Sequence, residues 1–333
     1  MESIATRSVR EQRVSPLDRI LLSAYNIFRL LIRAMSLYRS SFGRKIVGLI
    51  NAVGAHVTRG LLRIVHRHVT VRGRDMVLAG QRGPSPAYGL DMILGRYEPE
   101  VAEWFEQVVK PGMTVLDIGA HVGFYTLLAA ELVGKTGKVF AFEPEPENFA
   151  VLSKNVTSNK YVNIHLVNKA ITDKDGRVEL FINPQGNDRH SIYQNPRSVV
   201  AESRITVAST SIDEFLEMQG WPQVDVIKMD IEGAEPIAVE GMAGLLARSD
   251  SLKLLIEFAP ELLKAAGMVP DKLLARLNEV GFRLTFLEGD GTRRHLKPAQ
   301  FSQFAAEVDG AANLVCEWNS SATVVKGKLL QAR

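Results

Sequence analysis

The stretch Met113 to Phe124, MTVLDIGAHVGF, decides how this chain folds. Its apolar first half, Met113 to Ile118, predicts a buried strand, and the residues after it predict a turn into a helix that begins near Gly123. Gly119 and Gly123 have no Cβ, so they permit unusual backbone angles and a close approach of ligand to the main chain. The first amides of the following helix have no partners inside it and can face a ligand. The stretch therefore predicts a ligand-binding turn.

A second apolar strand, Lys138 to Phe142, delivers an acid, Glu143, 26 positions after Asp117. At the end of the second strand of a doubly wound sheet, an acid is placed to accept two hydrogen bonds from a ribose diol. The glycine spacing is D-x-G-x-x-x-G, whereas a dinucleotide cradle has G-x-G-x-x-G. The Asp117 carboxylate would repel a pyrophosphate and suits a cationic group, such as the α-ammonium of S-adenosylmethionine. These residues together predict a nucleoside pocket for that cofactor.

Five motifs, in order over residues 97 to about 318, resemble the FkbM-type family of class I, S-adenosylmethionine-dependent methyltransferases. They are YEPE (97–100), DIGAHVGFYT (117–126), FEPEPENF (142–149), NKAITD (168–173) and IKMDIEGAE (227–235). One departure is His121, where the family most often has a small polar residue, usually Asn. The resemblance implies a Rossmann-like α/β fold with a mostly parallel, seven-stranded sheet.

The alternation of strands and helices independently calls for a parallel sheet covered by helices on both faces. We expect its seven strands at 113–118, 138–142, 162–167, 224–229, 252–258, 282–287 and 313–318, with an additional hairpin strand at 177–182. Before them we expect a hairpin of strands 69–71 and 76–78 and a helix within 97–110. The irregular polar stretch 183–203 is interpreted as a substrate-facing lid or as a mobile connection.

The strand-end positions and the resemblance together imply the cofactor contacts. The resemblance places the adenine near Asn168 to Ala170. The expected cofactor-binding residues are Asp117, Gly119, Ala120, His121, Gly123, Glu143, Pro144, Asn168, Ala170 and Asp230.

The fourth strand ends in Asp230-Ile231-Glu232, which we predict to be the second chemical centre. A hydroxyl acceptor is neutral at pH 7 and needs a general base, for which the candidates are Asp230, Glu232 and His190, in that order. The alternative for the two acids is capping of the next helix. The His/Cys spacing of a zinc site is absent, and we expect no resident metal. A variant in which Asp230 and Glu257 hold one Mg²⁺ is the alternative.

The resemblance implies O-methylation of a hydroxyl on a sugar, a glycolipid or another lipid-linked glycan, or a secondary metabolite. An NAD(P)-binding oxidoreductase is one alternative, although it should carry the G-x-G-x-x-G turn that this chain lacks. A non-catalytic, membrane-associated module that binds S-adenosylmethionine is the other.

The amino-terminal segment, residues 1–70, is basic, whereas the rest of the chain is acidic. It carries twelve Lys and Arg against three acids, a net charge of +9, which leaves −6 for residues 71–333 of a chain whose total is +3. Apolar stripes predict two amphipathic helices within residues 15–67, without a run long enough to span a bilayer. The helices pack on the catalytic domain or another subunit, or they lie on an anionic membrane surface. Aromatic residues are not interleaved with the arginines, so no nucleic acid is expected.

These patterns divide the chain into the basic helical segment 1–70, a methyltransferase domain 71–318 and a flexible tail 319–333. Within the domain, residues 71–110 form a hairpin and cap, and residues 111–318 form the core. The single cysteine, Cys316, and the absence of a recognisable secretory signal predict a cytoplasmic protein, at the inner face of the membrane if the basic helices bind it.

Overall fold

The computed structural model of the protein describes residues 69–78, 91–92, 96–184, 186–194, 196, 203–249 and 251–318. The chain divides into two compact units, residues 1–78 with 83–97 and residues 79–82 with 98–333. The predicted amphipathic helices and the predicted tail lie outside the described residues. No helix in the described ranges is long and apolar enough to cross a membrane.

The first unit contains the predicted hairpin. Strands β1 (Val69–Val71) and β2 (Arg74–Met76) are antiparallel, with Val71 opposite Arg74. The two turn residues, Arg72 and Gly73, both have positive φ, 48° and 83°. A two-residue hairpin turn of this kind needs positive φ at both positions. The second strand therefore begins two residues earlier than the sequence predicted, and the turn is correspondingly shorter.

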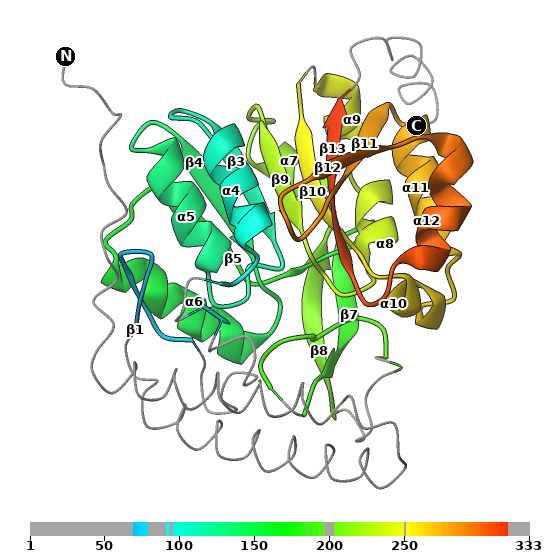
Figure 1. Ribbon diagram of the computed structural model, residues 1–333. Coiled ribbons are helices and arrows are strands. Elements are labelled where there is room, and N and C mark those ends of the chain that lie inside the picture. Colours follow the sequence, from blue (N-terminus) through cyan, green and yellow to red (C-terminus); the bar gives the residue numbers. More distant parts are fainter. Residues whose placement is uncertain are drawn as a thin grey trace, which may run out of the picture. The chain divides into compact units, whose positions relative to one another are not determined.

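Within the described residues of the second unit, eight strands form one sheet in the order β12-β11-β13-β10-β9-β3-β4-β5 (Figure 1). From the last-named edge they are β5 (Ile164–Val167), β4 (Lys138–Phe142), β3 (Thr114–Ile118), β9 (Val226–Met229), β10 (Lys253–Phe258), β13 (Ala312–Trp318), β11 (Phe282–Leu287) and β12 (Arg293–Leu296). Strands β5, β4, β3, β9 and β10 are parallel to one another, and β13 lies between β10 and β11 and is antiparallel to both. The predicted doubly wound sheet is confirmed, with β12 as an eighth strand that the sequence did not predict.

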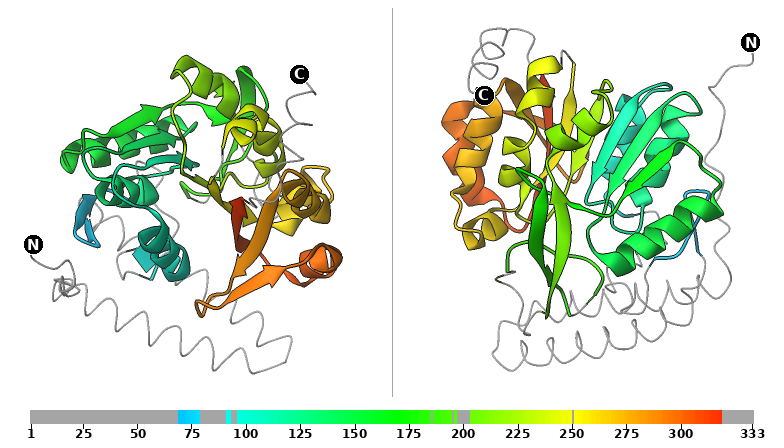
Figure 2. Two further views of the ribbon diagram at one scale, coloured as in Figure 1. Left: turned by 90° about the horizontal axis from the view of Figure 1, so that it is seen from above. Right: turned by 180° about the vertical axis from the view of Figure 1, so that it is seen from behind.

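Helices cover both faces of this sheet (Figure 2). They are α4 (Pro99–Val108), α5 (Phe124–Val133), α6 (Pro146–Ser158), α7 (Ile212–Met218), α8 (Glu235–Glu240), α9 (Ala243–Arg248), α10 (Pro260–Ala265), α11 (Pro270–Glu279) and α12 (Phe301–Glu307), with a short 3₁₀ helix, η2 (Pro298–Gln300). Because both faces are covered, the central strands are buried along most of their length, and β9 is buried at all four positions, including Lys228. Helix α7 begins with a capping box, in which Ser211 accepts the Glu214 amide and Glu214 accepts the Ser211 amide.

A second, three-stranded sheet has the order β6-β8-β7. Strand β7 (Gly176–Ile182) runs antiparallel to β8 (Ser203–Thr210), and β6 (Ala170–Ile171) pairs in parallel with β8. The hairpin strand predicted at 177–182 is confirmed, whereas β8 was not predicted. In the described part of the chain between β7 and β8, Ser191 forms an isolated bridge with Phe181.

Candidate active site

Three adjacent parallel strands end at the same level and carry the predicted acids. The last residue of β3, Ile118, lies opposite the last residues of both β4 and β9. Asp117 is the penultimate residue of β3, Glu143 follows β4, and Asp230 follows β9. The three acids therefore gather at the carboxyl edge of the sheet, where open α/β sheets bind ligands.

The turn after β3 is tightly fitted against the end of β9. A Cβ on Gly119, which has a φ of 79°, would lie 1.9 Å from the backbone oxygen of Asp230. The amides of Gly119 and Ala120 both donate to the Phe142 carbonyl, at 3.0 and 2.9 Å. Gly123 is the N-cap of α5 with a φ of 96°. The glycines are needed here for backbone conformation and for close packing.

His121 occupies the same turn with a φ of 52°. Among non-glycine residues, Asn, Asp and His tolerate positive φ best, so His121 suits this backbone position. Burial lowers the pKa of His121 to about 4, although Asp188 and the Asn187 backbone oppose the shift. The imidazole is therefore neutral at pH 7.

Asp117 is buried and only partly satisfied. Its side chain is 1% exposed, and Oδ2 accepts a hydrogen bond from Thr126 Oγ1 at 2.5 Å. Oδ1 is buried and has no hydrogen-bond partner among the residues that the structure describes. Burial raises the pKa of Asp117, while Lys228 opposes the shift. An orphaned carboxylate oxygen is a fitting acceptor for a cationic ligand group.

Glu143 is held by the backbone. Oε2 accepts the His121 amide at 2.8 Å and Oε1 accepts the Glu145 amide at 2.9 Å. Each carboxylate oxygen has a second lone pair, so the group can still accept two ribose hydroxyls. Burial raises the pKa of Glu143 to about 8, with the two amides opposing the shift. The backbone bonds fix the orientation of the carboxylate before any ligand binds.

Lys228 brings a buried positive charge to the same place. Its Nζ lies 3.1 Å from Asp230 Oδ2, and the side chains are 5% and 25% exposed. Burial disfavours the ammonium, but Asp230, Asp117 and Glu98 together raise the pKa of Lys228. The ammonium also lies 5.2 Å from the centre of the Tyr125 ring. Lys228 is therefore a fixed cation and not a proton acceptor at pH 7.

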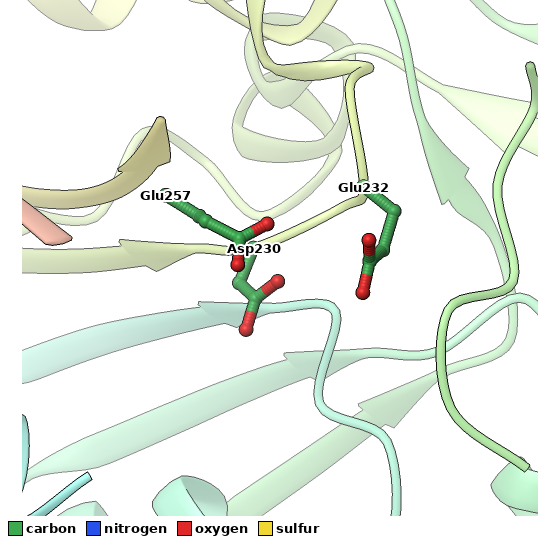
Figure 3. A group of neighbouring side chains, drawn as sticks. All are labelled: Asp230, Glu232 and Glu257. Carbon is green, nitrogen blue, oxygen red and sulfur yellow. The ribbon is translucent and has the colours of Figure 1, made fainter. Parts of the chain in front are cut away.

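Asp230 belongs to a group of three neighbouring carboxylates. One oxygen each from Asp230, Glu232 and Glu257 lie within 4.8 Å of one another. Figure 3 shows Glu257 at the end of β10 and Glu232 in the turn after β9 directed toward the same region as Asp230. Burial, followed by the charge of Asp230, raises the pKa of Glu232 to about 8 and that of Glu257 well above its ordinary value.

A family model described as the Methyltransferase FkbM domain matches residues 117–284, half of the chain. The chain belongs to the FkbM methyltransferase family. The predicted resemblance is confirmed, and with it the class I methyltransferase fold and S-adenosylmethionine as the cofactor of the family.

Relatives of this FkbM-family chain carry methyltransferase names. It is 27% identical over 144 residues to "2-O-methyltransferase NoeI" of Sinorhizobium fredii, covering 40% of this chain and 58% of that one. It is 26% identical over 152 residues to "Hexuronic acid methyltransferase AglP" of Haloferax volcanii, covering 45% and 59%. The chain thus spans less than two thirds of each relative. A solved SAM dependent methyltransferase from Aquifex aeolicus is 16% identical, with a TM-score of 0.37, covering 67% of this chain and 89% of that one.

The remaining predicted cofactor contacts of this FkbM-family site, Asn168, Pro144 and Ala170, differ in how exposed they are. Asn168 is exposed, and its Nδ2 donates to the carbonyls of Glu143 and Pro144 at 2.7 and 3.2 Å, which leaves Oδ1 available. Pro144 is half-buried between Glu143 and the N-cap of α6. Ala170 begins β6, and its side chain packs in the apolar cluster of the small sheet with Leu180. Only the backbone of Ala170 is suited to contact a ligand.

The chain between β7 and β8 is anchored to the carboxyl edge of the main sheet. Asn148 Nδ2 donates to the Asn187 carbonyl, and Ser191 Oγ donates to the Glu232 carbonyl, both at 2.7 Å. His190 Nδ1 accepts the Asn183 amide at 3.1 Å. This hydrogen bond occupies the Nδ1 lone pair, so Nδ1 would have to release it before it could accept a proton. His190 remains the third candidate base, after Asp230 and Glu232.

Two further acids, Glu98 and Glu235, lie at the site. Glu98 accepts the Tyr125 hydroxyl at 2.8 Å, and burial followed by the charge of Asp230 raises its pKa to about 7. Glu235 accepts the amides of Ile231 and Gly233, both at 3.0 Å. Glu235 thus stabilises the backbone of the turn after β9. The capping alternative had assigned a role of this kind to Asp230 or Glu232. The YEPE and DIEGAE motifs contain both residues, but motif membership does not reveal which acid faces the backbone.

Proposed function

We propose that this protein is an S-adenosylmethionine-dependent methyltransferase that methylates a hydroxyl of a sugar, a glycolipid or another lipid-linked glycan, or a secondary metabolite. The observation that carries the proposal is the gathering of Asp117, Glu143 and Asp230 at one sheet edge of an FkbM-family chain. The names of NoeI and AglP, a 2-O-methyltransferase and a hexuronic acid methyltransferase, favour a sugar hydroxyl as the acceptor.

Two acids orient the cofactor in this proposal. The buried Oδ1 of Asp117 is the partner for the α-ammonium group, and the carboxylate of Glu143 accepts the ribose hydroxyls. Gly119, Ala120, His121 and Gly123 form the turn beneath the nucleoside. Bound S-adenosylmethionine supplies a methyl group already activated by its sulfonium. The protein therefore has to align the acceptor, exclude water and remove one proton.

Asp230 is the residue we place beside the acceptor hydroxyl. Its Oδ2 is engaged by Lys228, which fixes the carboxylate and leaves Oδ1 for the acceptor proton. Glu232 lies in the same cluster and is the second candidate base. The anchored chain around Ser191 lies next to Glu232 and is placed to contact the acceptor.

Membrane contact through residues 15–67 would bring the enzyme to lipid-linked acceptors. The segment that contains them, residues 1–70, has a net charge of +9, which suits an anionic bilayer on the cytoplasmic side. We expect the full chain to co-sediment with anionic liposomes at low salt and to be released at high salt. Absence of co-sedimentation at low salt would remove the membrane from the proposal without touching the catalytic assignment.

Calorimetry with the full chain tests the central assignment. S-adenosylmethionine and S-adenosylhomocysteine should bind at one site per chain, and NAD should not bind. The expected difference follows from the acid and the glycine spacing in the turn after β3. Binding of NAD without binding of S-adenosylmethionine would overturn the proposed function in favour of an oxidoreductase.

A further inference from the structure

The cluster of Asp230, Glu232 and Glu257 has the chemistry of a cation site. One oxygen from each residue lies within 4.8 Å of the other two, a spacing that a single ion can bridge. The three residues come from the ends of two neighbouring strands and the turn between the sheet and α8 (Figure 3). The acids that shape the backbone nearby, such as Glu235, are not part of this cluster.

Glu257 has one carboxylate oxygen without a partner among the described residues. Its Oε2 is buried and accepts no hydrogen bond from the described part of the chain. Glu257 lies inside β10, where it is paired by its backbone with Asn313 of β13, so the side chain has a fixed origin. A buried carboxylate oxygen without a donor is costly, and a bound cation removes that cost.

The charges of the cluster match a divalent ion. When all three carboxylates are ionised, as in a metal-bound site, they carry −3, and Lys228 contributes +1 through its ion pair with Asp230 Oδ2. Two positive charges restore neutrality. Because all three ligands are carboxylate oxygens, hard ions such as Mg²⁺ and Mn²⁺ are favoured over zinc or copper.

We propose that Asp230, Glu232 and Glu257 bind one Mg²⁺ or Mn²⁺ ion that holds the acceptor oxygen for methyl transfer. For its catalytic role this proposal rests on the proposed function. Three oxygen ligands leave about three positions of an octahedral ion for water or substrate. Two neighbouring hydroxyls of a sugar can fill two of them, so the site favours acceptors with a vicinal diol.

Methyl transfer from S-adenosylmethionine to the acceptor oxygen needs no further reactant. The acceptor oxygen forms a bond to the methyl carbon as the carbon–sulfur bond breaks, and the electron pair of that bond stays on sulfur. S-adenosylhomocysteine leaves as a neutral thioether. The hydroxyl proton passes to a cluster carboxylate or to solvent, and binding of the hydroxyl to a cation makes that proton easier to lose.

Manganese binding to the full chain tests the site directly. Chelator-treated protein with S-adenosylhomocysteine is titrated with Mn²⁺, and free Mn²⁺ is followed by electron paramagnetic resonance. We expect one ion per chain in the wild type and at least about tenfold weaker binding in Glu257→Gln and Glu232→Gln, since even outer-shell changes cost about that much. Glu279→Gln, an exposed acid at the end of α11, is the matched control and should bind as the wild type.

The outcomes separate the cation site from the methyltransferase assignment. Absence of Mn²⁺ binding up to about 1 mM, the weak end for hard cations in proteins, would overturn the cation site. Wild-type binding in both cluster variants would do the same. If Glu257→Gln does not fold, as judged by circular dichroism, Glu232→Gln decides alone. Calorimetric binding of S-adenosylmethionine is measured on the same samples, and its failure counts against the proposed function and not against the ion.

Discussion

At the scale of single residues, the site is a place where negative charge is crowded and only partly compensated. Burial raises the pKa of Glu143 and Glu232 to about 8, and of Glu98 to about 7. Lys228 is a buried cation of this cluster, and it pairs with Asp230. Excess negative charge in a buried site is what a sulfonium, an ammonium group and a divalent ion would offset.

Asp230→Asn tests whether the acid after β9 takes part in the methyl transfer. The amide keeps the shape of the side chain but loses its charge and its basicity, so the turnover number should fall at least about 100-fold. The Kd for S-adenosylmethionine should change little, because Asp117 and Glu143 hold the cofactor in this proposal. Turnover is measured with a labelled methyl group, and Kd by calorimetry. Unchanged turnover would exclude Asp230 from the mechanism.

At the scale of elements, the turn between β3 and α5 is the part that least tolerates a side chain. Gly119 combines a φ of 79° with a would-be Cβ at 1.9 Å from the Asp230 carbonyl oxygen. A Cβ here would push β3 and β9 apart where their acids gather. Gly119→Ala should therefore reduce the free energy of unfolding and abolish binding of S-adenosylmethionine.

Gly291→Ala separates the effect of a positive φ from the effect of the contact between the added Cβ and Asp230. Gly291 has a φ of 85°, but a Cβ would meet nothing within 4 Å. The control should lose only the cost of positive φ, about 1–2 kcal/mol, and should bind the cofactor normally. Urea denaturation and calorimetry measure both quantities. Equal effects of the two substitutions would show that the contact with Asp230 is unimportant.

The same elements show what the sequence could predict. Helix α5 begins where Gly123 predicted, and β3 and β4 match their apolar runs within one residue. Strand β8, SRITVAST, was missed, and it depends on pairing with β7. Strand β12, RRHL, is polar and depends on pairing with β11. Pairing between distant segments leaves no mark in local periodicity.

The candidate site was predictable to a similar extent. Strand ends and motifs identified the acids at the carboxyl edge, because parallel strands bring their ends together whatever their separation in sequence. They did not identify the orphaned oxygen of Glu257 or the backbone bonds of Glu235. Those features depend on side-chain direction and burial, which one sequence does not encode locally.

At the scale of the whole molecule, buried acids couple stability to pH. Glu143, Glu232, Glu98 and Glu235 have an ordinary pKa of 4.5 and folded-state values of about 7 to 8. Between about pH 4.5 and pH 8 the folded chain holds more protons on these groups than the unfolded chain does. The free energy of unfolding therefore falls as pH rises. The contribution of these groups is therefore largest below about pH 4.5 and is lost by about pH 8.

We expect the protein without added ligand or metal to be less stable at pH 8 than at pH 5.5 by at least about 1 kcal/mol, or roughly 2–4 °C in melting temperature. Scanning calorimetry at constant ionic strength measures the change. Glu232→Gln removes one titrating group and should flatten the dependence, whereas the exposed control Glu279→Gln should leave it unchanged. A melting temperature that rises from pH 5.5 to pH 8 would contradict the burial of these acids. Added Mg²⁺ with S-adenosylmethionine should stabilise the protein more at pH 8 than at pH 5.5, because ionised carboxylates are the form that binds them.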